Sequence, residues 1–270
     1  MAAPDTTAGT GTGTGRAADF RAGHPAGTAS VDVWLVRTDA PAPAVAELTA
    51  LLDAEERARA DRLDPAGRDR FVVAHGVVRR IVGRCLDSAP ARIRWTRGRY
   101  GKPALAGPAT GLEVNLSHSD GLAAVAVSRG RPVGVDVQRA LPRLDATAMS
   151  ARYFPVVDAR FVASADGAAE RSDRFTRLWA RKEACVKAAG GRLVDGLQLP
   201  VYRPGDANGL LRAGLLVAAA PDGSECPGAR FRVRDLPVPP GFRAAVALLG
   251  GRPYRVRTRW WSEESDARAA

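Results

Sequence analysis

The sequence VGVDVQ at residues 133–138 alternates apolar and polar residues, which predicts a β-strand with two different faces. Its three valines share one face, which we expect to lie in a core. Gly134, Asp136 and Gln138 share the opposite face. Oxygen atoms from a carboxylate and an amide suit a hard cation, and a glycine permits close approach. Taken alone, however, the stretch is better explained as an ordinary strand whose polar residues face solvent.

Residues 173–189 predict a helix that ends at two glycines. Phe175, Trp179 and Val186 form an apolar stripe at helical spacing, and Lys182 lies within it. We expect the ammonium group of Lys182 either to reach into a cleft or to extend to solvent along its alkyl chain.

Glu183 and Lys187 lie four residues apart on the edge of this stripe. An exposed pair at this spacing contributes only about 0.2–0.5 kcal/mol, and that is the usual interpretation of such a pair. The nearby tryptophan favours a functional interpretation, because a wall with little water strengthens electrostatic interactions.

The same periodicities predict the other elements. We expect helices at 44–62 and 67–86, and strands at 31–37, 113–117, 122–128, 197–202, 215–219, 229–234 and 244–249. A helix followed by strands, twice, predicts an α+β protein of two pseudo-symmetric halves, each a small mainly antiparallel sheet with a long helix. A ligand cleft is expected between the halves. The expected boundaries are a disordered tail at 1–30, halves at 31–138 and 139–260, and a flexible tail at 261–270.

Composition limits the possible classes of protein. The chain has 270 residues, 46% of them hydrophobic, and contains neither a long apolar run nor a secretory signal. Its three cysteines are far apart, which suits a reducing cytoplasm. The net charge of +11 is scattered, without a basic block, so it favours an anionic cofactor or an acidic protein partner as much as a nucleic acid.

The few lysines and histidines also mark candidate residues. Only three of the 40 cationic residues are lysine, and one of them, Lys102, lies in the turn sequence YGKP at 100–103. Among three histidines, His75 lies in an apolar helix and is interpreted as structural. His118 lies between two serines in NLSHS at 115–119, where it is a better candidate for binding a phosphate.

Together, these motifs resemble the phosphopantetheinyl transferases, specifically the larger two-half type named after the surfactin-synthetase activator. The resemblance covers about Val31 to Trp260 and rests on NLSHS, VGVDVQ and LWARKEACVK at 178–187, with YGKP in support. It implies a cleft between two α+β halves that binds coenzyme A.

The resemblance also implies roles for individual residues. Asp136 and Glu183 would hold Mg²⁺, with Mn²⁺ as an alternative, against the pyrophosphate of coenzyme A. Many relatives have glutamate where this chain has Gln138, so water or the neutral amide of Gln138 would fill the remaining position. Lys187 would neutralise phosphate charge, and Lys182 would shape the site and contact the coenzyme. Lys102 and Ser117 would also contact the coenzyme. His118 would bind its 3′-phosphate, and Arg59 and Arg70 would contact the adenosine phosphates.

The implied reaction moves phosphopantetheine from coenzyme A to a serine of an acyl or peptidyl carrier protein and releases 3′,5′-ADP. Glu183 is the nearest candidate for the base. Length favours a monomer over the shorter, trimeric relatives that serve fatty-acid carriers. We expect a cytoplasmic protein with no membrane or nucleic-acid partner. A non-catalytic protein that binds coenzyme or nucleic acid is the alternative from a different class.

Overall fold

The computed structural model describes residues 29–107, 111–202, 210–212, 218–219, 225–226 and 230–262. The expected tails lie almost entirely outside these ranges, and so does most of the strand expected at 215–219, so these expectations stay predictions. No helix in the described part is both long enough and apolar enough to cross a membrane.

The described elements, in chain order, confirm an α+β protein. They are β1 (Ala29–Arg37), α1 (Ala42–Leu51), α2 (Ala54–Ala60), α3 (Pro65–Leu86), a 3₁₀ turn (Pro90–Arg92), β2 (Trp95–Arg97), β3 (Pro103–Leu105), β4 (Leu112–Ser119), β5 (Leu122–Arg129), β6 (Val133–Arg139), α4 (Ala146–Tyr153), α5 (Val156–Ala163), α6 (Ala168–Ala189), α7 (Leu193–Gly196), β7 (Leu210–Arg212), β8 (Ala218–Ala219), β9 (Glu225–Cys226), β10 (Arg230–Asp235), β11 (Phe242–Leu249) and β12 (Tyr254–Trp260).

Two four-stranded sheets form the centre of the protein, with strand orders β12-β1-β5-β4 and β6-β11-β10-β7. The β1–β12 pair is parallel, and the other strand pairs within these sheets are antiparallel. Sheet membership does not follow the chain order: β6 pairs with β11, whereas β12 pairs with β1. The sheet built mainly from the second half of the chain therefore contains β6, and the sheet built mainly from the first half contains β12. The expected boundary at residue 138 stays a prediction.

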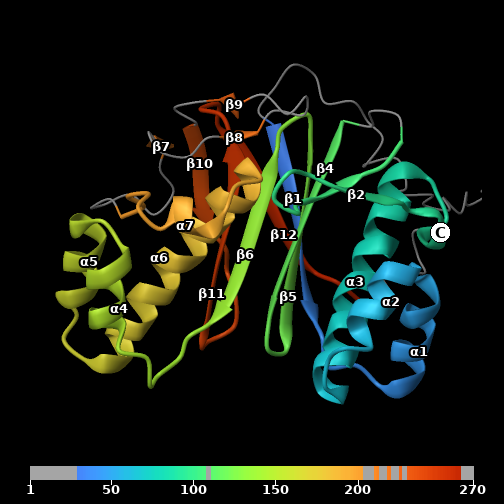
Figure 1. Cartoon of the computed structure of the whole chain (residues 1–270), viewed down its shortest axis with the longest axis horizontal. Helices are drawn as coiled ribbons and strands as arrows, with labels where there is room; N and C mark the ends of the chain where they lie inside the picture. Colours follow the sequence, from blue (N-terminus) through green and yellow to red (C-terminus); the bar gives the residue numbers. More distant parts are fainter. Residues whose placement is uncertain are drawn as a thin grey trace, which may run out of the picture. The chain divides into compact units, whose positions relative to one another are not determined.

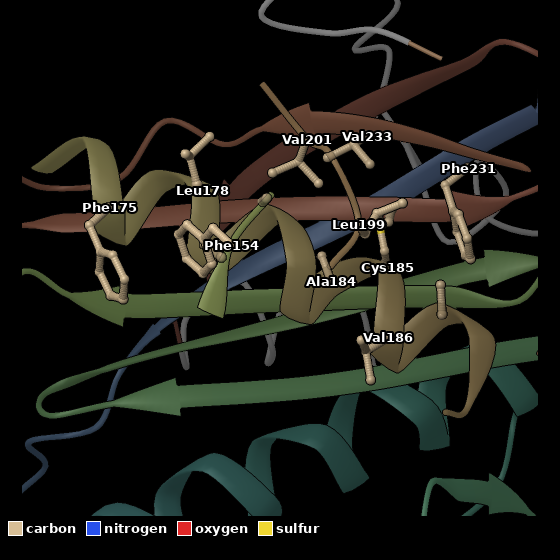
Figure 2. Packing of buried hydrophobic residues seen from close by; sticks show 14 of the residues in the cluster. Phe154, Phe175, Leu178, Ala184, Cys185, Val186, Leu199, Val201, Phe231 and Val233 are labelled. Atoms are coloured by element: carbon tan, nitrogen blue, oxygen red, sulfur yellow. The ribbon is translucent and has the colours of Figure 1, made fainter. Parts of the chain in front are cut away.

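Hydrophobic side chains fill the space between the sheets and beneath α6. The three valines of β6 are buried with residues of β1, β5 and β11, as their alternation predicted. Figure 1 shows α6 crossing β6 and β11, with α4 and α5 beyond it, while α1 to α3 lie beside the first sheet. Phe175, Leu178 and Cys185 of α6 pack against Phe231 and Val233 of β10 and other residues in a second cluster (Figure 2).

Gly134 allows α6 to lie directly on β6. A Cβ atom at this position would be 2.1 Å from the carbonyl oxygen of Ala184 and 2.3 Å from the backbone nitrogen of Ala188. Both neighbours are backbone atoms of the helix, so no side-chain movement could make room. The element that approaches this glycine is therefore α6, and not the cation that the sequence suggested.

Two expected elements are wrong in detail. The helix expected at 44–62 is interrupted between α1 and α2, because Leu52 is extended and Asp53 begins a new helix through a capping box with Glu56. The strand expected at 197–202 does not form. The carboxylate of Asp158 accepts the backbone N–H groups of Val201 and Tyr202, which would otherwise be available for a strand ladder. The sequence interpretation also missed α4, α5 and β12.

Candidate active site

Asp136 lies in the middle of β6, on the face that α6 covers, and its side chain is fully buried. Its Oδ1 atom accepts hydrogen bonds from the ammonium of Lys187 at 2.5 Å and from the hydroxyl of Ser117 at 2.7 Å. Its Oδ2 atom is also buried and has no hydrogen-bond partner among the described residues. Burial raises the pKa of Asp136, although Lys187, Ser117 and Gln138 all act in the opposite direction.

Glu183 and Lys187 lie one turn apart on α6 and face this aspartate. Burial raises the pKa of Glu183, the charge of Lys187 lowers it, and the carboxylate of Asp136 raises it. The strand aspartate and the helix glutamate are therefore close enough to repel each other. Glu183 is only half-buried, so the pair has access to solvent from its side.

These groups fit a divalent cation. A buried carboxylate oxygen without a partner is a costly arrangement, and an adjacent second carboxylate adds repulsion. Mg²⁺ binds to proteins through one or two carboxylates and keeps several waters. Gln138, half-buried on the same face of β6, is close enough to influence the pKa of Asp136 and could add an amide oxygen.

Side chains of β4 bind the edge of β6 that β11 leaves open. Asn115, Ser117 and Ser119 accept the backbone N–H groups of Val135, Val137 and Arg139 at 2.8, 3.3 and 3.0 Å. The two sheets are thus joined at this edge by side-chain bonds rather than by a backbone ladder. The NLSHS sequence therefore positions β6, a role that the sequence interpretation missed.

Lys102 binds at the same junction. Its ammonium donates to the carbonyl oxygens of Val133 on β6 and Ala188 near the end of α6, each at 3.2 Å, and lies 3.9 Å from Glu113. Burial lowers the pKa of Lys102, and Glu113 opposes this shift. The lysine links the YGKP turn to both elements that carry the candidate site, and its predicted contact with coenzyme stays a prediction.

Lys182 has a different environment from the one we expected. Its ammonium neither reaches a cleft nor extends to solvent: the side chain is fully buried and lies 2.6 Å from Asp158 of α5. It also donates to the carbonyl oxygen of Leu199 and lies 4.5 Å from the ring centroid of Phe154. Burial lowers the pKa of Lys182, whereas Asp158 raises it. This pair fixes α6 to α5, and contact of Lys182 with coenzyme stays a prediction.

A pocket of about 270 Å³ lies beside β4, lined by residues of α2, α3, β2 and the turn before β3. Arg59, His75, Trp95 and His118 all contribute to its walls. Partial desolvation lowers the pKa of His118, and the positive charges of His75, Lys187 and Arg59 lower it further. Asp53, Glu55 and Glu56 also line this pocket, so an anionic group would have to bind beside Arg59 and His118.

The wall formed by α2 is held by a buried arginine that the sequence interpretation did not single out. Arg79 of α3 is fully buried and binds Glu56 at 2.6 Å and Asp53 at 2.5 Å. His75 contacts Glu56 at 3.1 Å and stacks on Phe71, so its interpretation as a structural histidine agrees with these contacts. Helix α3 contains four other arginines, so its sequence carries no signal that Arg79 is the buried one.

Arg70 lies apart from this set. Its guanidinium is exposed and pairs with Asp39 at 3.4 Å, and Arg70 is not among the residues that line the pocket.

Asp158 is the other residue that the sequence interpretation missed. Its signal was the buried lysine itself, because a lysine on an apolar stripe requires an acidic partner.

The fold and the paired carboxylates define an α+β protein with a candidate site for a divalent cation. The model of the 4′-phosphopantetheinyl transferase superfamily matches residues 132–212. The chain is 33% identical to the 4′-phosphopantetheinyl transferase HetI of Nostoc over 163 residues, which is 59% of this chain and 68% of that protein. It is 30% identical to the phosphopantetheinyl transferase of Thraustochytrium over 67% of this chain and 68% of that protein.

A further similarity points to the larger type within this class. The chain is 26% identical to the 4′-phosphopantetheinyl transferase Sfp of Bacillus subtilis over 49% of this chain and 55% of that protein. The chain belongs to the 4′-phosphopantetheinyl transferase family, in its larger, two-half form. It is an enzyme of this transferase type, and the family uses coenzyme A as substrate and acts on carrier protein domains.

Proposed function

We propose that the enzyme transfers phosphopantetheine from coenzyme A to a serine of an apo carrier protein, with Mg²⁺ as cofactor and 3′,5′-ADP as the second product. The serine oxygen would form a bond to the β-phosphorus of coenzyme A, while the bond from that phosphorus to the bridging oxygen breaks. The observation that carries the proposal is the buried Oδ2 of Asp136, which lacks a partner among the described residues and lies near Glu183.

Asp136 and Glu183 would hold the metal ion, with the amide of Gln138 or a water at the remaining protein-side position. A bound Mg²⁺ would neutralise negative charge on the coenzyme diphosphate. Mn²⁺ has a similar preference for oxygen ligands and would replace it. Asp136 is already held by Lys187 and Ser117, so its carboxylate needs little reorientation when the ion binds.

Three cationic or polar residues would bind the phosphates. Lys187 uses N–H donors on Asp136 and Ser117, and its side chain is partly exposed, so the remaining donor can reach a phosphate oxygen. Arg59 and His118 line one pocket, where they would bind the adenosine 3′-phosphate. A guanidinium binds a phosphate through two parallel hydrogen bonds, which fixes its position as well as its charge.

Glu183 would accept the proton of the attacking serine hydroxyl. Its role as base rests on its position beside the metal site, and the proton would pass to its carboxylate directly or through a water molecule. Its half-buried position, at the solvent side of Asp136, is compatible with access by a serine on a carrier domain.

The partners would be acyl or peptidyl carrier domains of polyketide, nonribosomal peptide or fatty-acid synthesis. The net charge of +11 would speed encounter with an acidic domain, and this effect weakens as salt is added. We further propose that the enzyme works in the cytoplasm as a monomer.

The test incubates the enzyme with coenzyme A, Mg²⁺ and an apo carrier protein, and follows the mass of the carrier and the release of 3′,5′-ADP. We expect transfer by the wild type, none in EDTA, and a loss of at least 100-fold in Asp136→Asn and Glu183→Gln. Asp195→Ala, which removes a half-buried carboxylate of α7 that pairs with Arg192, is the matched control, and its transfer rate should be unchanged. Wild-type rates in either site variant would contradict the proposal.

A further inference from the structure

The hydroxyl of Ser117 lies at the centre of the candidate site and contacts three polar groups. Its Oγ atom is 2.7 Å from Oδ1 of Asp136, 3.0 Å from Nζ of Lys187 and 3.3 Å from the backbone nitrogen of Val137. The carboxylate can only accept, so the hydroxyl donates to Asp136. The ammonium and the backbone N–H can only donate, so the hydroxyl accepts from both.

These three bonds use the whole capacity of a serine hydroxyl, which has one hydrogen and two lone pairs. Ser117 is also buried. A coenzyme phosphate could bind its hydroxyl only by displacing the carboxylate of Asp136. A contact of this hydroxyl with coenzyme, which the family resemblance implies, would therefore require the observed bonds to rearrange.

The bonds determine which oxygen of Asp136 is available. Oδ1 accepts from both Ser117 and Lys187, whereas Oδ2 is buried without a partner among the described residues. A carboxylate held at one oxygen by a fixed donor presents the other in a defined direction. Ser117 is itself fixed, because β4 is tied to β6 by the bond from Val137.

We propose that Ser117 is a positioning residue for the metal site: it orients the carboxylate of Asp136 so that Oδ2 faces the ion, and it does not bind coenzyme A. The inference rests on the proposed function of Asp136 as a metal ligand. Groups that orient metal-binding carboxylates affect metal affinity or activity by roughly 10–100-fold when removed.

The chain offers a matched control two residues away. Ser119 lies on the same side of β4 and accepts the backbone N–H of Arg139 at 3.0 Å, just as Ser117 accepts that of Val137. None of the hydrogen bonds described for its side chain goes to Asp136 or Lys187. Ser117→Ala and Ser119→Ala therefore each remove a bond to a backbone N–H of β6, but only Ser117→Ala also removes the bonds to Asp136 and Lys187.

Two binding measurements separate the roles. Mn²⁺ is titrated into each protein saturated with coenzyme A and followed by water proton relaxation. Coenzyme A is titrated calorimetrically in EDTA, so that no metal contributes. We expect Ser117→Ala to weaken Mn²⁺ binding by about 10-fold or more and to leave coenzyme affinity in EDTA within about twofold, which is the size of an ordinary distant substitution. Ser119→Ala should change neither.

A second pair of variants protects the test against a folding defect. Ser117→Thr and Ser117→Val have nearly the same shape and differ in a hydroxyl against a methyl group. Thr should keep Mn²⁺ affinity near that of the wild type, and Val should lose it. In transfer assays at saturating coenzyme A, Val should lower kcat at limiting Mg²⁺ and recover as Mg²⁺ is raised, while KM for coenzyme A stays constant.

The outcomes distinguish the two proposals. Loss of coenzyme affinity in EDTA in Ser117→Ala, or wild-type Mn²⁺ affinity in both Ser117→Ala and Ser117→Val, would overturn the positioning role. Asp136→Asn is measured alongside: if it loses Mn²⁺ binding while the Ser117 variants do not, only the positioning role fails. If the wild type and Asp136→Asn bind Mn²⁺ equally, the proposed metal site fails with it.

Discussion

Two lysines of helix α6 each pair with an aspartate of another element. The pairs differ in whether both oxygens of the aspartate have hydrogen-bond partners. Lys182 and Asp158 are both fully buried, and the aspartate also accepts the backbone N–H groups of Val201 and Tyr202. Lys187 and Asp136 are just as close, but the lysine is partly exposed and one oxygen of the aspartate has no described partner. The comparison shows that a short ion pair on this helix can be either closed and structural or open to a ligand.

The largest expected effect is the loss of stability when the closed pair of Lys182 and Asp158 is broken. Asp158→Asn should lower the free energy of unfolding by about 3–5 kcal/mol, because it leaves the buried ammonium of Lys182 without a counter-charge. Asp136→Asn should change it by no more than about 1 kcal/mol, because Lys187 can be hydrated. Urea denaturation of both variants measures the difference. Equal losses in the two variants would mean that the pairs are not distinct.

A smaller effect is expected on the rate of transfer, where the Lys187–Asp136 pair matters more than the Lys182–Asp158 pair. Asp136→Asn should slow transfer by at least about 100-fold, or roughly 2.7 kcal/mol. The double variant Lys182→Met with Asp158→Leu should fold and retain most transfer, since an apolar replacement of a closed pair is often neutral. Initial rates of carrier modification below the melting temperature test this. An inactive but folded double variant would assign Lys182 a direct role at the site.

The helix and the strand that form this site could be predicted from sequence, because their periodicities are local. The alternation of VGVDVQ and the helical stripe at 173–189 predicted the strand that carries Asp136 and the helix that carries Glu183, whereas their convergence was implied by the family resemblance. The partners of the two lysines could not be predicted in the same way. Asp158 and Lys182 belong to different helices, and nothing local in VVDARFVA distinguishes a buried aspartate from an exposed one.

The exchange of strands between the sheets was also outside the reach of local patterns. Strand β12 has the sequence YRVRTRW, and its alternation shows a strand but not its neighbour. Pairing with β1 depends on which edge of a distant sheet remains open. The interruption between α1 and α2 was more accessible, since Asp53 and Glu56 form a capping box that the residues themselves indicate.

An intermediate effect is expected when α6 is moved away from β6, which separates Lys187 from Asp136. Gly134→Ala places a Cβ against the backbone of α6, at 2.1 Å from the carbonyl oxygen of Ala184, so the helix must shift away from β6. We expect a loss of about 1–3 kcal/mol in stability, together with reduced transfer as Lys187 and Glu183 move from Asp136. Gly167→Ala, at the start of the same helix in open space, is the control. Unchanged transfer in Gly134→Ala would contradict the close packing.

The smallest effect is electrostatic: Lys187 influences the pKa of His118, and Lys182 does not. Partial desolvation and the charges of His75, Lys187 and Arg59 hold the pKa of His118 below its usual 6.5. Lys187→Met should therefore raise the pKa of His118 measured by NMR titration, and Lys182→Met should not. Because the folded state binds this proton less readily than the unfolded chain, the contribution of His118 to stability is present above pH 6.5 and is lost as pH falls towards the folded pKa. An equal response to both lysine variants would contradict this.

The pairing of β12 with β1 has a consequence for synthesis of the chain. Ala29 is the register partner of Tyr254, and Leu35 that of Trp260. The first described strand to be synthesised therefore waits for the last described strand before its sheet is complete. Until then, one edge of β1 presents unpaired backbone groups to the cell. Early binding of a chaperone to that nascent edge would delay aggregation, and a stop codon before residue 254 would leave the edge permanently open.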